Sequence, residues 1–184
     1  MKKIPVLFVL ILCLAADYCY GQLEPGSGTA YCSHKHTSLK NPVTHENVQF
    51  SGYDVSYLRF SLHIDPAIDY VSGSVFTLFE VTGDLSDGLK MELSVDLIVD
   101  SVKSQGNLIP FIQSGEYSLS LQLPGSSEIG SMQEVEVFYQ GIPVSGAGFG
   151  SVGREEHNGI PAMWTLSEPY GCRDWWPGKN DLTD

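Results

Sequence analysis

The chain has 184 residues, with 22 acidic and 10 basic side chains and a formal net charge of −12. This length suits one domain, and 42% hydrophobic residues with only 17% charged residues exclude a disordered chain. The acidic balance argues against binding to nucleic acid, which depends on clustered Lys and Arg, and against docking on an anionic membrane. The 19 Gly and 10 Pro residues favour an all-β protein with many turns.

The N-terminus has the pattern of a secretory signal peptide. Lys2 and Lys3 precede an apolar run from Ile4 to Ala16, and a charged segment followed by a short apolar run is typical of an export signal. The run is shorter than the about 20 residues that a transmembrane helix needs. We therefore expect cleavage after Gly21 and an exported protein without a membrane span.

Residues 22–47 show no periodicity and are expected to form an N-terminal arm. His34 and His36 lie two positions apart in it, but no third metal ligand follows in a recognisable pattern. His45-Glu46 lacks the second His that a zinc-protease helix requires. The sequence therefore predicts no metal site in this chain.

Two cysteines remain after the expected cleavage, Cys32 and Cys172. Export would allow a disulfide bond between them. The spacing does not decide between a bond that ties the arm to the C-terminal part and two separate thiols.

Alternating apolar and polar residues predict six β-strands. The expected strands are residues 53–64, 71–82, 89–100, 108–112, 117–123 and 132–139. In 89–100 the alternation is strict over twelve residues, which predicts one strand whose solvent-facing side carries Lys90, Glu92 and Ser94. Short turns between the strands favour an antiparallel sheet or sandwich, and no stretch of ten or more residues has a helical period.

The character of the chain changes after Gln140. Several glycines between Gly141 and Gly153 are expected to interrupt regular structure. All three Trp residues follow in the segment 164–176. Such a concentration of indole rings indicates either a plug of the core or a recognition site.

Glu168 is the candidate functional residue of this segment. It lies between Ser167 and Pro169, and the proline favours an extended backbone at Glu168. A carboxylate among aromatic rings can bind a cation, such as a substrate ammonium group. The alternative is a structural ion pair with Arg173 or Lys179, and the chemistry of the residues leaves both possibilities open.

Residues 167–181, Ser-Glu-Pro-Tyr-Gly-Cys-Arg-Asp-Trp-Trp-Pro-Gly-Lys-Asn-Asp, resemble the end of the N-terminal domain of M1-family zinc aminopeptidases, the aminopeptidase N group. Upstream, residues 53–62 are similar to the first strand of that domain, and 71–75 and 89–99 to its next strands. The resemblance implies an all-β, antiparallel, saddle-like β-sandwich that is incomplete at its C-terminal end. The expected organisation is a signal peptide (1–21), an arm (22–47) and this β-domain (48–184).

The resemblance also implies a substrate-binding site. In the family, a Glu or Gln in the segment that matches Thr165–Arg173 binds the free α-amino group of a peptide. At that position this chain has Glu168, and Pro169 and Tyr170 would border the pocket for the first side chain of the substrate.

The catalytic parts of the family lie in the next domain. The zinc motif, its Glu base and the Gly-x-Met-x-Asn motif are not found in this sequence. The resemblance therefore implies a substrate-anchoring domain without catalytic or metal-binding residues, inactive alone, whose parent protein carries zinc in a catalytic domain of the same chain. The alternative function is a stand-alone, secreted β-sandwich that binds peptide or carbohydrate.

Overall fold

The computed structural model describes residues 50–125, 127–143, 151–168 and 170–181. The expected signal peptide and arm lie outside these residues, as do Cys32, His34 and His36.

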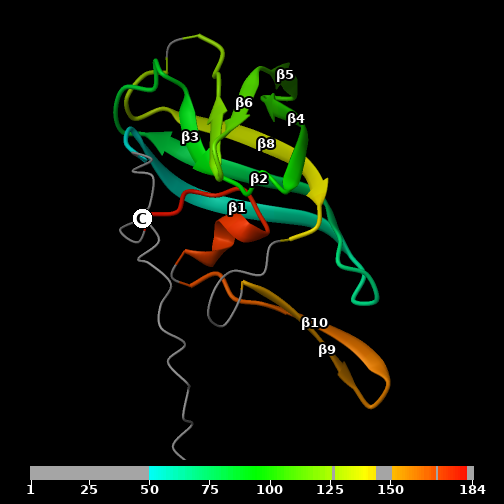
Figure 1. The fold of residues 1–184 in the computed structure, drawn as a ribbon. Helices are drawn as coiled ribbons and strands as arrows, with labels where there is room; N and C mark the ends of the chain where they lie inside the picture. The colour runs from blue at the N-terminus through cyan, green and yellow to red at the C-terminus, as the bar shows by residue number, and fades with distance from the viewer. Residues whose placement is uncertain (1–49, 126, 144–150, 169, 182–184) are drawn as a thin grey trace, which may run out of the picture. The chain divides into compact units, whose positions relative to one another are not determined.

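The described residues form ten β-strands and one short 3₁₀ helix, η1 (Figure 1). In chain order these are β1 (Tyr53–Ile64), β2 (Val71–Val81), β3 (Leu89–Glu92), β4 (Leu97–Ser104), β5 (Asn107–Ile109), β6 (Phe111–Ser114), β7 (Ser118–Leu121), β8 (Met132–Gly141), β9 (Val152–His157), β10 (Ile160–Thr165) and η1 (Gly171–Asp174). Within the described ranges, no helix is long and apolar enough to span a membrane.

The strands form three antiparallel sheets. A five-stranded sheet has the order β1-β2-β8-β4-β5, a three-stranded sheet the order β3-β7-β6, and β9 pairs with β10. Figure 1 shows β1, β2 and β8 side by side. Every strand pair in the described residues is antiparallel, which confirms the expected all-β, antiparallel fold.

The five-stranded and three-stranded sheets share one hydrophobic core. Alternate residues of their strands point into it, as the two-residue period of a strand requires. The largest fully buried side chains are Tyr139, Phe79, Leu89, Met91, Leu93, Leu97, Leu119 and Leu121. Burial of each Leu, Met or Phe side chain contributes about 1.5–3 kcal/mol, so this core accounts for the stability of the sandwich.

The prediction of one strand over residues 89–100 is wrong, because the chain passes from one sheet to the other between residues 92 and 97. β3 ends at Glu92 and belongs to the three-stranded sheet, whereas β4 begins at Leu97 in the five-stranded sheet. Between them the amide of Leu97 donates to the carbonyl of Ser94 (3.0 Å), which forms a turn. Both strands bury their apolar residues in the same core, so the alternation continues through the corner.

A second corner splits the expected strand 108–112. β5 ends at Ile109 in the five-stranded sheet, and β6 begins at Phe111 in the three-stranded sheet. Pro110 lies between them and has no N–H to donate to a ladder. The remaining expected strands agree with the structure to within a few residues at each end.

The sequence predicted no strand after residue 139, but residues 152–165 form the β9–β10 hairpin, and the expected interruption is wrong at Gly153, which lies within β9. Its two-residue turn is Asn158-Gly159, with positive φ angles of 53° and 79°. These angles are those of a type I′ turn, for which Asn-Gly is the preferred sequence. This dipeptide is the signal that could have predicted the hairpin.

The corner between β3 and β4 can be tested by two alanine substitutions. Leu93 is fully buried, whereas Val95, which the alternation places on the same side, is 45% exposed. Leu93→Ala should lower the free energy of unfolding by about 2–5 kcal/mol, and Val95→Ala by no more than about 0.5 kcal/mol. Urea denaturation of the two variants measures the difference. Similar losses in both would indicate one continuous strand.

Candidate functional site

A buried carboxylate holds the C-terminal part of the domain against β3. Glu92 is only 3% exposed. Its Oε2 atom accepts hydrogen bonds from Arg173 (3.2 Å) and from the side-chain amide of Asn180 (2.7 Å). The guanidinium group of Arg173 also lies 3.9 Å from the ring centre of Tyr117. We call Glu92, Arg173 and Asn180 the Glu92 anchor.

Backbone contacts reinforce the Glu92 anchor. The amide and carbonyl of Glu92 pair with those of Gly178 at 2.9 and 3.1 Å, which adds a short stretch of ladder to the edge of β3. The amide of Ser94 donates to the carbonyl of Arg173 (2.8 Å). Glu92 and Ser94 were expected on the solvent-facing side of the strand. They are buried because the segment from Arg173 to Gly178 covers them.

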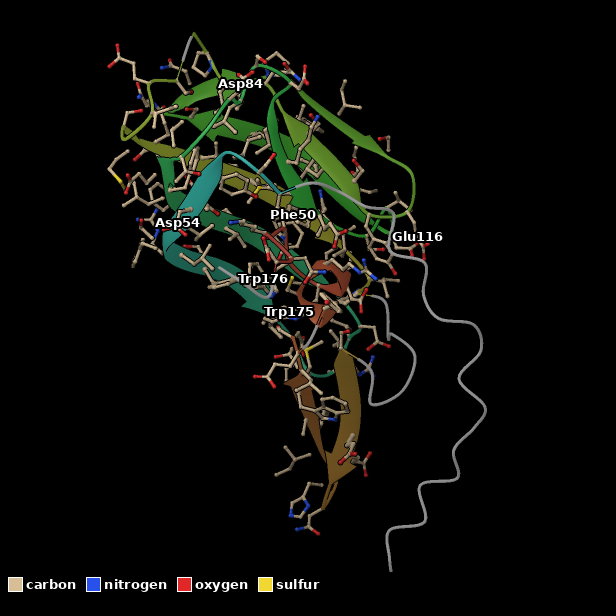
Figure 2. The ribbon with its side chains drawn as sticks, turned by 90° about the vertical axis from the view of Figure 1, so that its left-hand side faces the viewer. Phe50, Asp54, Asp84, Glu116, Trp175 and Trp176 are labelled. Carbon is tan, nitrogen blue, oxygen red and sulfur yellow. The ribbon has the colours of Figure 1, made fainter. Side chains whose placement is uncertain are left out.

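Trp175 and Trp176, which are labelled in Figure 2, are half-buried, whereas Trp164 is 39% exposed. Trp175 and Trp176 lie edge to face at 6.3 Å, and both contact Phe60, at 6.4 and 5.0 Å between ring centres. Trp176 packs against the hydrophobic core, and the hydroxyl of Tyr139 donates to the carbonyl of Trp175 (2.9 Å). For this pair, the structure favours the plug interpretation over an open recognition surface.

Glu168 lies in a tight turn between β10 and η1. The amide of Gly171 donates to the carbonyl of Ser167 (2.7 Å), and the amide of Leu166 donates to the carbonyl of Ser151 (2.8 Å). A Cβ atom on Gly171 would lie 2.6 Å from the carbonyl oxygen of Leu166 and from the hydroxyl oxygen of Ser151. Gly171 is therefore closely packed against Leu166 and Ser151, and this position requires glycine.

The side chain of Glu168 is exposed and belongs to none of the ion pairs or hydrogen bonds of the described residues. Arg173 pairs with Glu92 instead, and Lys179 donates to the carbonyl of Tyr53 (3.0 Å). The alternative of a structural pair between Glu168 and either cation is therefore wrong.

Tyr170 and Pro169 were expected to border the pocket beside Glu168, and the structure describes only Tyr170. Tyr170 is half-buried, and its carbonyl accepts a hydrogen bond from the side-chain amide of Asn180 (3.3 Å). The Glu92 anchor therefore reaches the turn directly. Pro169 lies outside the described residues.

A second buried acid supports the other side of the turn. The hydroxyl of Ser151 donates to Oδ2 of Asp174, which is 5% exposed. Burial raises the pKa of Asp174 above its ordinary value of 3.8, although the bond from Ser151 and the charge of Arg173 oppose the shift. Sequence reasoning missed both Ser151 and Asp174 because they lie 23 residues apart.

Cys172 carries a free, buried thiol. Its Sγ atom donates to Oδ1 of Asn180 (3.3 Å). Burial, with a smaller contribution from the charge of Glu92, raises its pKa to about 12. A thiol of this kind is a structural group and not a nucleophile at neutral pH.

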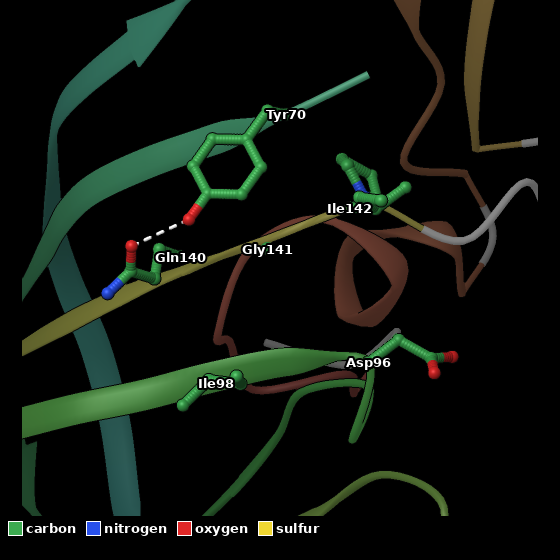
Figure 3. A pocket seen from close by; sticks show the side chains of 7 residues that line it. Tyr70, Asp96, Ile98, Gln140, Gly141 and Ile142 are labelled. Carbon is green, nitrogen blue, oxygen red and sulfur yellow. Dashed lines mark hydrogen bonds between the residues drawn. The ribbon is translucent and has the colours of Figure 1, made fainter. Parts of the chain in front are cut away.

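A separate open pocket of about 750 Å³ lies at the ends of β4 and β8 (Figure 3). Its lining consists of Tyr70, Asp96, Ile98, Gln140, Gly141, Ile142 and Pro143. The hydroxyl of Tyr70 donates to Gln140 (2.6 Å), which in turn donates to Asp100 (2.8 Å). Asp96 bonds to Ser94 instead. The turn that carries Glu168 contributes no residue to this pocket, so the candidate site at Glu168 is separate from it.

Among the described residues, no group of three or more His, Cys, Asp or Glu side chains is arranged to hold a metal ion. These residues therefore do not fit a zinc site. What the turn offers chemically is one exposed carboxylate on a firmly held backbone, which suits recognition of a cation.

Solved structures share this arrangement of strands. A variant of the M1 zinc metallopeptidase from Deinococcus radiodurans, bound to a Tyr-Ser-Ala substrate, has a TM-score of 0.60 and 22% identity over 70% of this chain and 29% of its own. Native LTA4 hydrolase from yeast has a TM-score of 0.60 and 15% identity over 71% of this chain and 21% of its own. No model of a protein family and no curated protein matches the sequence.

The fold is that of the N-terminal domain of M1 zinc metallopeptidases. This chain spans less than a third of the length of these solved structures. The structural likeness confirms the M1 N-terminal fold that the segment 167–181 had suggested.

The Glu92 anchor should be necessary for the M1 N-terminal fold. Glu92→Ala would leave Arg173 buried without its partner, and breaking a buried ion pair in this way costs about 3–5 kcal/mol. The exposed pair between Arg154 and Asp69 is the control, since Asp69→Ala should cost about 1 kcal/mol at most. Chemical denaturation measures the free energy of unfolding of both variants. An equally small loss in Glu92→Ala and Asp69→Ala would contradict the role of the Glu92 anchor.

The raised pKa of Asp174 predicts a dependence of stability on pH. A carboxyl group whose pKa is higher in the folded state binds protons more tightly there, so its contribution to stability is largest below pH 3.8 and is lost as pH rises through the folded-state value. Wild type should therefore lose stability relative to Asp174→Asn as pH increases from acid to neutral. Melting midpoints measured in parallel test this, and a constant difference would show that Asp174 does not titrate in that range.

Proposed function

We propose that this chain is the N-terminal, substrate-anchoring domain of an exported M1-type zinc aminopeptidase, an enzyme that removes residues from the N-terminus of peptides. In this proposal the carboxylate of Glu168 binds the α-ammonium group of the substrate. The observation that carries it is an exposed carboxylate, without a partner among the described residues, on a closely packed turn of the M1 N-terminal fold.

The ligands named for the similar structures support a ligand with a free amino group. Two structures of an M1 zinc metallopeptidase variant hold L-arginine and L-tryptophan, and that of the Deinococcus radiodurans variant holds a Tyr-Ser-Ala substrate. All three molecules carry an α-ammonium group at neutral pH. A carboxylate forms a charge-assisted hydrogen bond with such a group, about twice as strong as a bond between neutral groups.

The proposal places the zinc ion and the catalytic groups in a further domain of the same polypeptide, because the described residues do not fit a zinc site. The role of this domain is then to bind and orient the substrate. Support for export comes from Lys2, Lys3 and the apolar run after them. Mass spectrometry of the exported protein should find its N-terminus at Gln22, and a retained Met1 would contradict export.

The alternative, a stand-alone module that binds peptide or carbohydrate, depends on an open aromatic surface. Trp175 and Trp176 are half-buried: both contact Phe60, and Trp176 also packs against the core. Trp164 and Phe60 are 39% and 42% exposed, so the aromatic surface open to such a ligand is limited to parts of these rings. A reading frame that continues past codon 184 into a His-Glu-x-x-His motif would exclude this alternative. A stop codon there would favour it.

Glu168→Ala in the complete enzyme tests the proposed role. Loss of a hydrogen bond to a charged group costs about 1.5–3 kcal/mol, so kcat/KM for a peptide with a free N-terminus should fall by at least about tenfold. Glu168→Gln keeps an acceptor without the charge and should show an intermediate loss. Neither variant should change the melting midpoint, because the exposed Glu168 side chain forms no hydrogen bond or ion pair among the described residues.

The matched control is Glu80→Ala, which removes another exposed carboxylate, on β2. Its kcat/KM should equal that of wild type, which would show that the loss in Glu168→Ala is not a general effect of net charge. An unchanged kcat/KM in Glu168→Ala would refute the anchoring role, although the fold assignment would stand.

A further inference from the structure

The residue before Glu168 is held by an unusual pair of contacts. The hydroxyl oxygen of Ser167 accepts hydrogen bonds from the indole N–H groups of Trp175 (3.2 Å) and Trp176 (3.4 Å). A serine hydroxyl has two acceptor lone pairs, so these two donors occupy both. An indole N–H can only donate, and each therefore needs an acceptor where it is half-buried.

The two donors are themselves firmly supported. Trp176 packs against the hydrophobic core, and both rings contact Phe60. The carbonyl of Trp175 accepts a bond from Tyr139, the largest fully buried side chain of the domain. A continuous set of contacts therefore leads from the core to Ser167, one residue before the exposed carboxylate.

We propose that Ser167 is a positioning residue for Glu168: the two indole N–H groups hold the Ser167 hydroxyl and thereby fix the backbone from which the Glu168 side chain extends. This inference rests on the proposed function of Glu168 in binding the substrate ammonium group. Ser167 need not touch the substrate. It fixes the backbone from which the Glu168 side chain extends before the substrate arrives, so less of the binding free energy is lost in ordering the site.

The first test is Ser167→Ala in the complete enzyme. The substitution removes the acceptor of both indole N–H groups, and kcat/KM for a peptide with a free N-terminus should fall by about three- to tenfold. Ser167→Thr keeps the hydroxyl and should retain most of the activity. Ser131→Ala is the matched control, because it removes a hydroxyl that bonds only within a surface turn, to the carbonyl of Glu128.

A double-mutant cycle separates positioning from a general structural effect. If Ser167 acts through Glu168, Ser167→Ala should reduce kcat/KM in the wild type but have little further effect in the Glu168→Ala background. If it only stabilises the fold, the same loss should appear in both backgrounds, together with a lower melting midpoint. Trp175→Phe, which removes one donor and keeps a ring, provides a second variant should Ser167→Ala fail to fold.

The outcomes distinguish the two proposals. A large loss in Glu168→Ala with none in Ser167→Ala or Trp175→Phe would overturn the positioning role and leave the proposed function intact. Equal effects of Ser167→Ala in both backgrounds would also overturn it. An unchanged kcat/KM in Glu168→Ala would refute the proposed function and the positioning role together.

Discussion

The ion pair between Glu92 and Arg173 is the constraint on which the arrangement of the candidate site depends. An ionised carboxylate that is 3% exposed is unfavourable unless charged and polar partners surround it. Both partners of Glu92, Arg173 and Asn180, lie beyond the start of η1. Glu92 therefore obtains its partners only when that segment lies on β3. Burial of Glu92 therefore requires that the segment from Arg173 to Asn180 pack on β3.

Docking of the segment also determines where the Glu168 turn lies. η1 begins at Gly171, directly after the turn, and contains Arg173 of the Glu92 anchor. On the other flank, Ser151 contacts both Leu166 and Asp174. These buried polar residues support the segments on both sides of Glu168, whose side chain is exposed. A site that must hold one charged group in place requires this division between supporting and contacting residues.

The fold could be predicted from the sequence wherever a strand keeps one face in the core along its whole length. This holds for β1, β2 and β8, whose observed bounds are within two residues of the expected ones. It fails at 89–100 and 108–112, where the chain passes from one sheet to the other. Both sheets bury the same core, so an apolar residue every second position continues across the corner. Periodicity reports which side of the chain is buried, and it does not report which sheet the strand joins.

The candidate site was predictable only in part, for a related reason. Glu168 could be identified because its neighbours in the sequence carry the resemblance and the proline signal. Its supports could not be, since Glu92 contacts Arg173 across 81 residues and lies on a side of β3 that the alternation assigns to solvent. An alternating pattern separates the two faces of a strand, but it gives no information about a later segment that covers the polar face. A buried polar residue on such a face therefore becomes recognisable only when the covering segment, and the cation that it brings, are seen in place.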